Sequence, residues 1–461
     1  MSETNISDIV ARARAAQSRY EQGGSQERYD RAVQAVAWAI MEPTRNRELA
    51  ELAVATTGLG NVPDKITKNH RKTLGLMRDI KHAATFGVTS DDPASGITEI
   101  ARAKGVVGAI VPSTNPAATP ANNIINALKC GNAIVVAPSP KGVACSERLI
   151  AFIHAEFAKI DEDPDLVQMI PAPGSKEKTQ TLMEACDMIV ATGSQNNVHR
   201  AQTAGTPAVA VGAGNVTVIV DETADLDAAA DKIRASKCFD NATSCSSENA
   251  VVVVDAIYDA FIKALARAKG ALIEDETALV AKLWPDGHLN RSVIAQDADK
   301  MIAALDITVP TGTEFIVVPT TGIGAAHPLS GEKLSRVLTL YRARDFEEAV
   351  AVTRDIQLYQ GAGHSVGLHS AIDARAHTLA TAVPTSRVIV NQAHTFATGG
   401  SFTNGMPFSL SMGCGTWGGN SVNENVNYRH FLQSTKIIRE IPAREPSLDD
   451  IFEDYWGVAG R

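Results

Sequence analysis

Short, almost continuously apolar runs alternate with amphipathic stretches through the first half of the chain. The apolar runs are rich in Val, Ile and Ala, which is typical of strands that are buried on both faces of a parallel sheet. The predicted strands span residues 105–111, 133–137, 166–170, 188–193 and 207–214. The predicted helices between and after them span residues 119–129, 143–157, 175–186 and 195–204. The pattern therefore predicts an α/β fold with a parallel sheet covered by helices.

Helix signals also occur at both ends of this region and near the C-terminus. Apolar residues recur at helical spacing over residues 5–40, which predicts one long helix there. Thr119 precedes Pro120 and is predicted to cap the helix 119–129. Ser447 is predicted to cap a last helix with an apolar stripe at Leu448, Ile451, Phe452, Tyr455 and Trp456. We expect this helix to dock on the body of the protein or on a neighbouring subunit.

A second α/β region begins after a polar segment near residue 240. Residues 248–255 have the pattern of a buried strand, and residues 257–268 have the spacing of a helix. The sequence thus predicts two domains, 1–240 and 241–424, with residues 425–461 returning to the first domain or to a subunit interface.

Composition and charge exclude several classes of protein. The 461 residues carry a net charge of −9, so no global positive field attracts nucleic acid. No apolar stretch approaches the 18 or more residues that a membrane-spanning helix needs. The N-terminal residues lack the apolar core of a secretion signal, and the six cysteines form no CxxC pair. We therefore expect a cytoplasmic protein with no membrane or nucleic-acid partner and no metal site.

Among the cysteines, Cys245 has the surroundings of a nucleophile. It lies in the polar segment NATSCSS, between a predicted helix and a strand, where small neighbours leave room for a substrate. A thiolate there attacks a carbonyl carbon and forms a covalent adduct. The alternative, an inert structural thiol, stays open on the residues alone.

The carboxyl ends of the predicted strands indicate where a ligand binds. They carry the segments PSTNP, PSPKG, PAPGS and TGSQNN, each placed close to the start of a helix. Helix N-termini present free N–H groups to anions, so this edge of the sheet favours an anionic dinucleotide. No GxGxxG motif is present, and VGAGN at 211–215 is a weak glycine signal.

Several motifs in a fixed order resemble one known family over nearly the whole chain. They are IVPSTNPAATP (110–120), VATGS (190–194), AVAVGAGN (208–215), SKCFDNATSCSSE (236–248), GEKLS (331–335), GAGH (361–364) and GCGTWGGNSVNENV (413–426). Together they resemble the coenzyme A-acylating branch of the aldehyde dehydrogenase superfamily. The resemblance implies a Rossmann-type cofactor domain over 1–240 and an α/β catalytic domain over 241–424.

The resemblance also implies roles for individual residues. Cys245 resembles the nucleophile, Asn115 the side chain that donates to the developing oxyanion, and His364 a histidine that takes a thiol proton. Glu332 resembles the carboxylate that holds the nicotinamide ribose. The alternatives are a turn residue before Pro116 for Asn115, a packing histidine for His364 and a solvated helix-start residue for Glu332. The implied cofactor-binding set is Ser113, Thr114, Ser139, Pro140, Lys141, Thr192, Gly193, Ser194, Gly212 and Glu332.

Two departures from hydrolytic, NAD-linked members carry information. Residues 211–215 hold no carboxylate where the hydrolytic members have a glutamate that activates water. Deacylation by the thiol of coenzyme A is therefore expected, because a thiol is far more reactive than unactivated water. Pro140 stands about where many NAD-linked members have a glutamate, and Lys141 follows it. This favours NADP slightly over NAD.

The substrate and partners are predicted less directly. The residues of 112–132 and 239–249 are most similar to those of acylating sulfoacetaldehyde dehydrogenases, so sulfoacetaldehyde is the expected small aldehyde, with acetaldehyde and propionaldehyde as alternatives. Arg429 and the Asn-rich segment 420–427 are candidates for contacting a sulfonate. The basic run 65–72 is expected to be a solvated helix face, with contact to coenzyme A phosphates as the alternative.

Family members assemble as homodimers or homotetramers, so the resemblance implies one of these states. Three rival functions stay open at this point. They are a hydrolytic aldehyde dehydrogenase, an acyl-phosphate reductase and a silent nucleotide-binding structural subunit.

Overall fold

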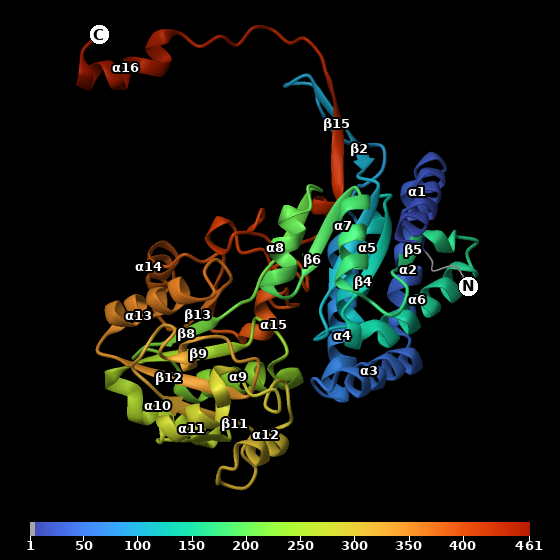
Figure 1. Ribbon diagram of the computed structural model, residues 1–461. Helices are drawn as coiled ribbons and strands as arrows, with labels where there is room; N and C mark the ends of the chain where they lie inside the picture. The colour runs from blue at the N-terminus through green and yellow to red at the C-terminus, as the bar shows by residue number, and fades with distance from the viewer. Residues whose placement is uncertain (1–4) are drawn as a thin grey trace.

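The computed structural model describes residues 5–461 as two α/β bodies, each built on a parallel sheet, and a projecting antiparallel arm (Figure 1). The first sheet has the order β5-β4-β3-β6-β7, with β3 (Val106–Val111), β4 (Ala133–Pro138), β5 (Val167–Met169), β6 (Met188–Thr192) and β7 (Ala208–Val211). Every residue of β3 and β4 is buried, so both faces are covered, as the apolar runs predict. The chain order reverses between β3 and β6, the place where open α/β sheets bind ligands.

The helices of the first body confirm the predicted alternation and correct its N-terminal end. They are α1 (Ile6–Gln22), α2 (Gln26–Met41), α3 (Pro43–Thr57), α4 (Val62–Ile80), α5 (Ala118–Lys129), α6 (Val143–Phe157), α7 (Lys176–Ala185) and α8 (Gln195–Thr203). The single helix predicted over 5–40 is wrong, because Gly23 and Gly24 separate α1 from α2. Ser25 starts α2 by accepting a hydrogen bond from the backbone N–H of Arg28.

The predicted cap of α5 is also wrong. The helix begins at Ala118, and the preceding Ala117 offers no side-chain cap. Thr119 lies inside the first turn, where its side chain is fully buried and its hydroxyl has no hydrogen-bond partner within residues 5–461. Its backbone N–H bonds to the carbonyl oxygen of Asn115, so the turn that follows β3 sets the start of the helix.

The second sheet has seven parallel strands in the order β10-β11-β12-β9-β8-β13-β14. They are β8 (Val216–Val220), β9 (Glu248–Val254), β10 (Gly270–Leu272), β11 (Phe315–Pro319), β12 (Val337–Ala343), β13 (Val366–His369) and β14 (Val388–Val390). Its helices are α9 (Leu226–Cys238), α10 (Tyr258–Arg267), α11 (Glu276–Leu283), α12 (Ala298–Leu305), α13 (Phe346–Tyr359), α14 (Ala374–Ala382) and α15 (His394–Thr398). None of the helices described for residues 5–461 is long and apolar enough to cross a membrane.

The chain passes from the first sheet to the second between β7 and β8. The apolar core of the first body includes Val211, whereas Val216 belongs to the core of the second. The crossover at 212–215 therefore lies ahead of the boundary that the sequence suggests near residue 240. Because β8 and α9 join the second body, the segment that carries Cys245 connects two elements of the same body.

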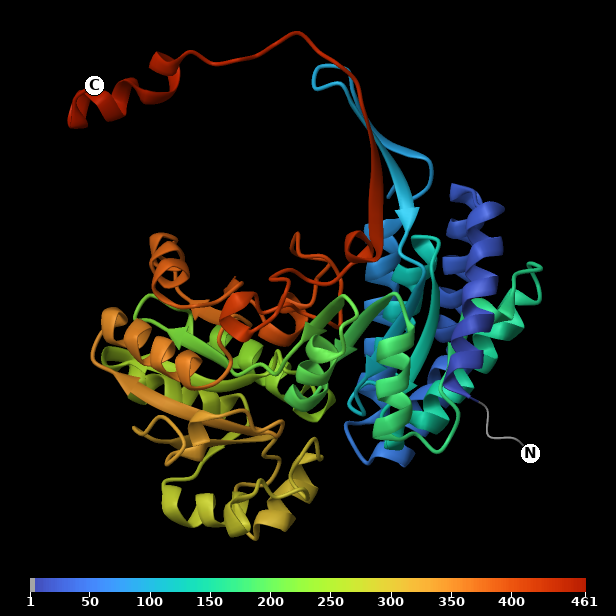
Figure 2. The ribbon, with the colours of Figure 1, turned by 45° about the horizontal axis from the view of Figure 1, so that its top comes forward.

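The third sheet forms an arm that projects from the first body (Figure 2). It consists of β1 (Val88–Asp92), β2 (Ile97–Ala103) and β15 (Leu432–Ile438), with β15 antiparallel to β2 along its whole length. The C-terminal segment thus returns to the N-terminal part of the chain. Beyond it, α16 (Leu448–Ala459) is capped by Ser447, as predicted. None of its residues is buried, so the expectation that it docks on the body of its own chain is wrong.

Candidate active site

A cavity of about 310 Å³ lies at the carboxyl ends of β3 and β6, where the first body faces the second. Its lining includes residues from the turn after β3, the turn after β6, helix α4 and the segment that carries Cys245. The sequence-predicted site residues that line it are Ser113, Thr114, Asn115, Thr192, Gly193, Ser194, Gly212, Cys245 and Glu332. The position agrees with the general rule for ligand sites at the reversal of strand order.

The segment before Cys245 has an unusual backbone. Three consecutive non-glycine residues, Asp240, Asn241 and Ala242, have φ values of 48°, 55° and 60°. Such a left-handed conformation costs about 1–2 kcal/mol for each residue. The Asp240 side chain offsets this cost, because it accepts hydrogen bonds from the backbone N–H of Asn61 and from the ammonium groups of two lysines. Contacts from outside the segment therefore impose its course.

Those two lysines belong to α4 and connect the two bodies. The Lys65 Nζ donates to the Thr114 carbonyl oxygen at 3.0 Å and to Asp240 at 3.0 Å. The Lys68 Nζ donates to Asp240, to the Asn115 Oδ1 at 3.0 Å and to the Thr243 hydroxyl at 2.9 Å. Because an ammonium group only donates, it fixes the Asn115 amide with Oδ1 toward Lys68. The amide nitrogen of Asn115 donates to the Thr114 hydroxyl at 3.5 Å and keeps its second proton for a ligand in the cavity.

His364 lies directly behind the cysteine, outside the cavity lining. Its Nε2 is 3.2 Å from the Cys245 Sγ, and its Nδ1 is 2.8 Å from the Ser365 hydroxyl oxygen. The Ser365 hydroxyl lies 2.9 Å from the Nε2 of His394. When the Ser365 hydroxyl accepts a hydrogen bond from Nδ1–H, the neutral His364 ring carries its proton on Nδ1. The lone pair of Nε2 then faces the Cys245 thiol. The geometry favours a proton-accepting histidine over the packing alternative.

Two glycines permit this close approach. A Cβ on Gly214 would lie 2.4 Å from the Cys245 carbonyl oxygen and 3.0 Å from the His364 ring. Gly363 has a φ of +81°, and a Cβ there would lie 1.7 Å from the Cys414 carbonyl oxygen. Larger residues at either position would push the segments that carry the thiol and the imidazole apart.

Burial determines the protonation states of the pair. It raises the pKa of the Cys245 thiol to about 12, and the negative charge of Glu332 adds to the effect. Burial likewise lowers the pKa of His364 to about 3, with the charge of Arg387 acting in the same direction. The pair is therefore a neutral thiol hydrogen-bonded to a neutral imidazole in the free protein, and the thiol loses its proton only as it reacts.

These protonation states predict how the free protein reacts with iodoacetamide. The alkylation rate follows the thiolate fraction, so it should rise about tenfold per pH unit between about pH 7 and pH 10, with no plateau in that interval. The rate is measured by mass spectrometry as the increase in alkylated protein with time. The Cys245→Ala variant gives the blank for alkylation of the other five thiols. A plateau below pH 8 would contradict the prediction, because it would indicate a stable thiolate–imidazolium pair.

Comparison with known proteins agrees with this geometry. Residues 1–279 match the aldehyde dehydrogenase family. The chain belongs to that family. It is 55% identical over 460 residues to the acylating sulfoacetaldehyde dehydrogenase of Cupriavidus necator, covering 99% of this chain and 93% of the relative. It is 35% identical to the acetylating succinate-semialdehyde dehydrogenase of Clostridium kluyveri, covering 99% of both. An acetylating aldehyde dehydrogenase from Geobacillus thermoglucosidasius superposes with a TM-score of 0.91 at 29% identity, covering 96% and 98%.

The first body of this aldehyde dehydrogenase contains the Rossmann-like parallel sheet, and the second body contributes Glu332 to the shared cavity. Glu332 tests whether that cavity fits a nicotinamide dinucleotide. Glu332 is half-buried in the cavity wall, where desolvation raises its pKa to about 8, and its Oε1 has no hydrogen-bond partner within residues 5–461. A carboxylate oxygen without a donor fits the hydroxyl groups of a ribose. The solvated helix-start alternative is wrong, because the side chain lines the cavity and no helix starts at this position.

The remaining predicted cofactor residues lie beside the cavity, after β4. Ser139, Pro140 and Lys141 follow the end of the strand and do not line the cavity. The Ser139 hydroxyl is buried without a hydrogen-bond partner in the described chain, whereas Lys141 is exposed. The neighbouring α6 presents its N-terminal backbone N–H groups at the same edge of the sheet, an arrangement that suits phosphate oxygens.

The basic run of this aldehyde dehydrogenase is not a solvated helix face, so that expectation is wrong. Lys65, Lys68 and Lys72 are all buried on α4, and Lys68, Arg71 and Lys72 line the cavity. The spacing of the three lysines, i, i+3 and i+7, is that of one helical stripe and is the signal in the sequence that points to a shared face. Burial is tolerated because Asp240 and several carbonyl groups lie opposite the stripe.

The two candidates for contacting a sulfonate are corrected by the geometry. Arg429 is exposed and lies over the Tyr428 ring, and it does not line the cavity. No residue of segment 420–427 lines the cavity either; its Asn425 is buried and accepts a hydrogen bond from Arg387. Arg387 also donates to the His364 carbonyl oxygen, so this segment supports the histidine rather than a substrate.

Proposed function

We propose that the protein is a coenzyme A-acylating aldehyde dehydrogenase that oxidises sulfoacetaldehyde to sulfoacetyl-coenzyme A with NAD(P)⁺. The observation that carries the proposal is the contact of Cys245 with His364 at a cavity that contains Asn115 and no carboxylate from residues 211–215. The substrate is supported by the 55% identity to an acylating sulfoacetaldehyde dehydrogenase over nearly the whole chain. The catalytic group is thus Cys245, with Asn115 and His364 acting on the same adduct.

In the first half of the reaction, the Cys245 sulfur adds to the aldehyde carbon while its proton passes to the Nε2 of His364. The carbonyl oxygen becomes negative, and the amide of Asn115 and the backbone N–H of Cys245 donate to it. That N–H donates to no other residue within residues 5–461, so it is available. Donors positioned in advance stabilise an oxyanion by a few kcal/mol in a water-poor site. The nicotinamide, when bound, accepts the hydride.

In the second half, an acyl group is held on Cys245 as a thioester. Ala213 lines the cavity and Gly214 contacts the Cys245 backbone, so this stretch supplies no base to activate water. His364 first releases the proton it took from Cys245 to solvent. The thiol of coenzyme A then attacks the thioester, its proton passes to the Nε2 of His364, and His364 returns it to the departing Cys245 sulfur. Acyl-coenzyme A leaves and the Cys245 thiol is restored.

The decisive assay compares aldehydes and acceptors under the same conditions. With sulfoacetaldehyde and coenzyme A, we expect steady formation of NAD(P)H, and without coenzyme A only about one equivalent per active site. Sulfoacetaldehyde should have a kcat/KM at least about tenfold above that of acetaldehyde or propionaldehyde. Steady turnover without coenzyme A would instead establish a hydrolytic enzyme. Equal or better turnover of acetaldehyde would defeat the sulfonate assignment.

Cofactor preference belongs to the same proposal, with a slight preference for NADP⁺ over NAD⁺. Pro140 places no carboxylate at the edge of the sheet, and the exposed Lys141 makes no ion pair with the described residues. A free ammonium group attracts a charged 2′-phosphate much more strongly than a neutral 2′-hydroxyl. Running the sulfoacetaldehyde assay with each cofactor compares the two kcat/KM values, and a strong preference for NAD⁺ overturns this part.

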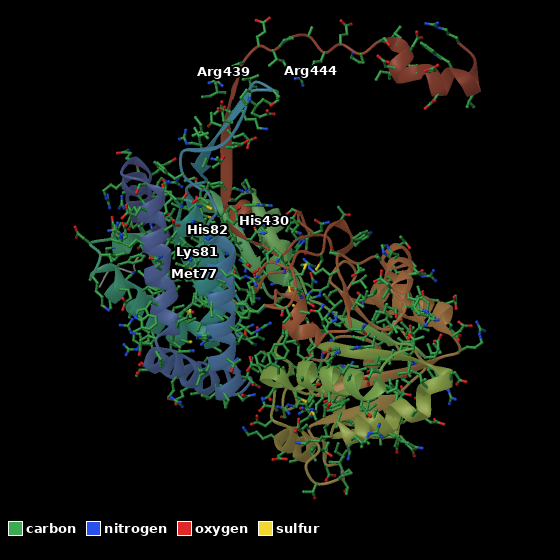
Figure 3. The ribbon with its side chains drawn as sticks, turned by 180° about the vertical axis from the view of Figure 1, so that it is seen from behind. Met77, Lys81, His82, His430, Arg439 and Arg444 are labelled. Carbon is green, nitrogen blue, oxygen red and sulfur yellow. The ribbon has the colours of Figure 1, made fainter. Side chains whose placement is uncertain are left out.

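We further propose that the arm joins two copies of the chain into a homodimer or homotetramer. Figure 3 shows Arg439 and Arg444 on the tail that leads away from the bodies after β15. Arg439 bonds to Thr98 on β2, and Arg444 bonds to Ala94 in the turn between β1 and β2. The apolar stripe of α16 is largely exposed, with Leu448 at 63% and Tyr455 at 65%. A stripe of this kind needs a partner surface in water.

The same chain is proposed to work in the cytoplasm. All six cysteines are free thiols, which is the usual state in a reducing compartment.

A further inference from the structure

Two cations on α4 line the cavity beside Cys245 without a compensating carboxylate. Arg71 and Lys72 both belong to the cavity wall, and Lys72 is only 9% exposed. Within residues 5–461, neither side chain lies within ion-pair distance of an aspartate or glutamate. An unpaired buried charge is costly, so this arrangement is stable only with polar contacts and gains from an anion in the cavity.

Polar contacts hold both side chains but leave donors free. Lys72 donates to the carbonyl oxygens of Gly399 and Ser409, which uses two of its three protons. One terminal nitrogen of Arg71 donates to the Phe396 carbonyl oxygen at 2.9 Å. Its other two nitrogens make no hydrogen bond within the described residues. A planar guanidinium with free donors is suited to the oxygens of a sulfonate or carboxylate.

Aromatic rings fix the position of the guanidinium. The Arg71 Cζ lies 5.1 Å from the centroid of the Phe396 ring and 5.4 Å from that of Phe408. The Lys72 Nζ lies 5.8 Å from the Phe408 ring centroid. These rings shield the cations from water on one side, which strengthens their attraction for an anion on the other.

The surroundings of Lys72 show that its charge is poorly stabilised without a ligand. Burial lowers its pKa to about 7, and the positive charges of Arg71 and Lys68 act in the same direction. Lys72 and Cys245 line the same cavity, so an anion bound in it lies near the ammonium group. The negative charge of a bound anion would raise the pKa of Lys72, so anion binding and protonation of Lys72 support each other.

We propose that Arg71 and Lys72 form the subsite that binds the anionic end of the substrate, the sulfonate of sulfoacetaldehyde. The inference rests on the proposed function for the identity of the anion. Three observations do not depend on the proposed function. They are the free donors of Arg71, the aromatic rings around its guanidinium and the place of both cations in the wall of the cavity that contains Cys245. An aldehyde that carries its anion one carbon from the carbonyl is held between this subsite and the thiol. Arg71 and Lys72 thus determine specificity, and the groups that react are elsewhere.

The test compares charged and neutral aldehydes in Arg71→Met and Lys72→Met variants. For each variant, kcat/KM for sulfoacetaldehyde should fall at least about 100-fold, because a charged hydrogen bond is lost. For propionaldehyde, which is neutral, kcat/KM should change by less than about threefold. Arg78→Met on the same helix is the matched control, since Arg78 lies outside the cavity wall and bonds to Asp79. It should behave as the unchanged protein with both aldehydes.

A binding measurement separates this inference from the substrate assignment. Ethanesulfonate should slow alkylation of Cys245 by iodoacetamide in the unchanged protein and lose this effect in Arg71→Met. Succinate semialdehyde serves as a second anionic aldehyde. One outcome is that the protein accepts succinate semialdehyde with coenzyme A, with a kcat/KM that depends on Arg71 and exceeds that for sulfoacetaldehyde. In that case the anion subsite stands and the proposed substrate fails. If Arg71→Met lowers the rates with charged and neutral aldehydes equally, the subsite is overturned while the acylating function stands.

Discussion

Replacing Cys245 by alanine is expected to lower the rate of NAD(P)H formation by at least about 10³-fold, with sulfoacetaldehyde and with any other aldehyde that the protein accepts. The reason is that the Cys245 sulfur lines the cavity and lies 3.2 Å from the Nε2 of His364. Without it, no covalent adduct forms and the aldehyde hydrogen has no path to leave as hydride. The rate is measured from NAD(P)H absorbance at saturating aldehyde and cofactor.

Two controls make this result specific. Cys238→Ala removes a thiol only seven residues away in the chain that lies outside the cavity wall, and its activity should be retained within about threefold. Mass spectrometry of the protein incubated with aldehyde and cofactor, without coenzyme A, should show an acyl adduct that is absent from Cys245→Ala. Retained turnover or a retained adduct in that variant would show that another group is the nucleophile.

Replacing Asn115 by alanine is expected to lower kcat by about 10²–10³-fold with little change in KM. The Asn115 amide is oriented by the ammonium of Lys68, 3.0 Å from its Oδ1, so its nitrogen is already positioned when the carbonyl oxygen becomes negative. A donor that acts only on the developing oxyanion affects kcat and kcat/KM to the same extent. Steady-state kinetics with sulfoacetaldehyde and saturating coenzyme A separate the two constants.

Asn115→Asp should be at least as impaired, because a carboxylate in the same place repels the oxyanion. Asn423→Ala is the matched control, since Asn423 is exposed and outside the cavity wall, and it should retain its activity. A rise in KM with kcat unchanged in Asn115→Ala would contradict the oxyanion role, because it would place the amide in ground-state binding.

Much of the first body follows from local sequence. The central strands β3 and β4 are apolar on both faces, and the motif around Cys245 is polar and small, so pattern and chemistry agree. The break between α1 and α2 does not emerge from hydrophobic spacing, because the apolar stripe continues on both sides of Gly23 and Gly24. There, backbone freedom overrides the periodic pattern.

The site depends on contacts that no local pattern contains. Lys68 is buried because Asp240, more than 170 residues later in the chain, lies against it. The His364 ring approaches Cys245 because glycines at 214 and 363 remove side chains from the space between segments. The family resemblance indicates that Cys245, Asn115 and His364 share one site. The ion pairing that buries α4, and with it Arg71, is a tertiary effect that the spacing of the lysines alone does not predict.

The lysine contacts of α4 also limit how the protein exchanges ligands. One ammonium group, that of Lys68, holds the Asn115 amide in the first body and the Asp240 carboxylate in the second. A hinge rotation that separated the bodies would expose Asp240 and break the hydrogen bond that orients Asn115, at a cost of several kcal/mol. Aldehyde, cofactor and thiol are therefore expected to enter and leave through loop movements at the cavity mouth, while the two bodies keep a constant relative orientation throughout turnover.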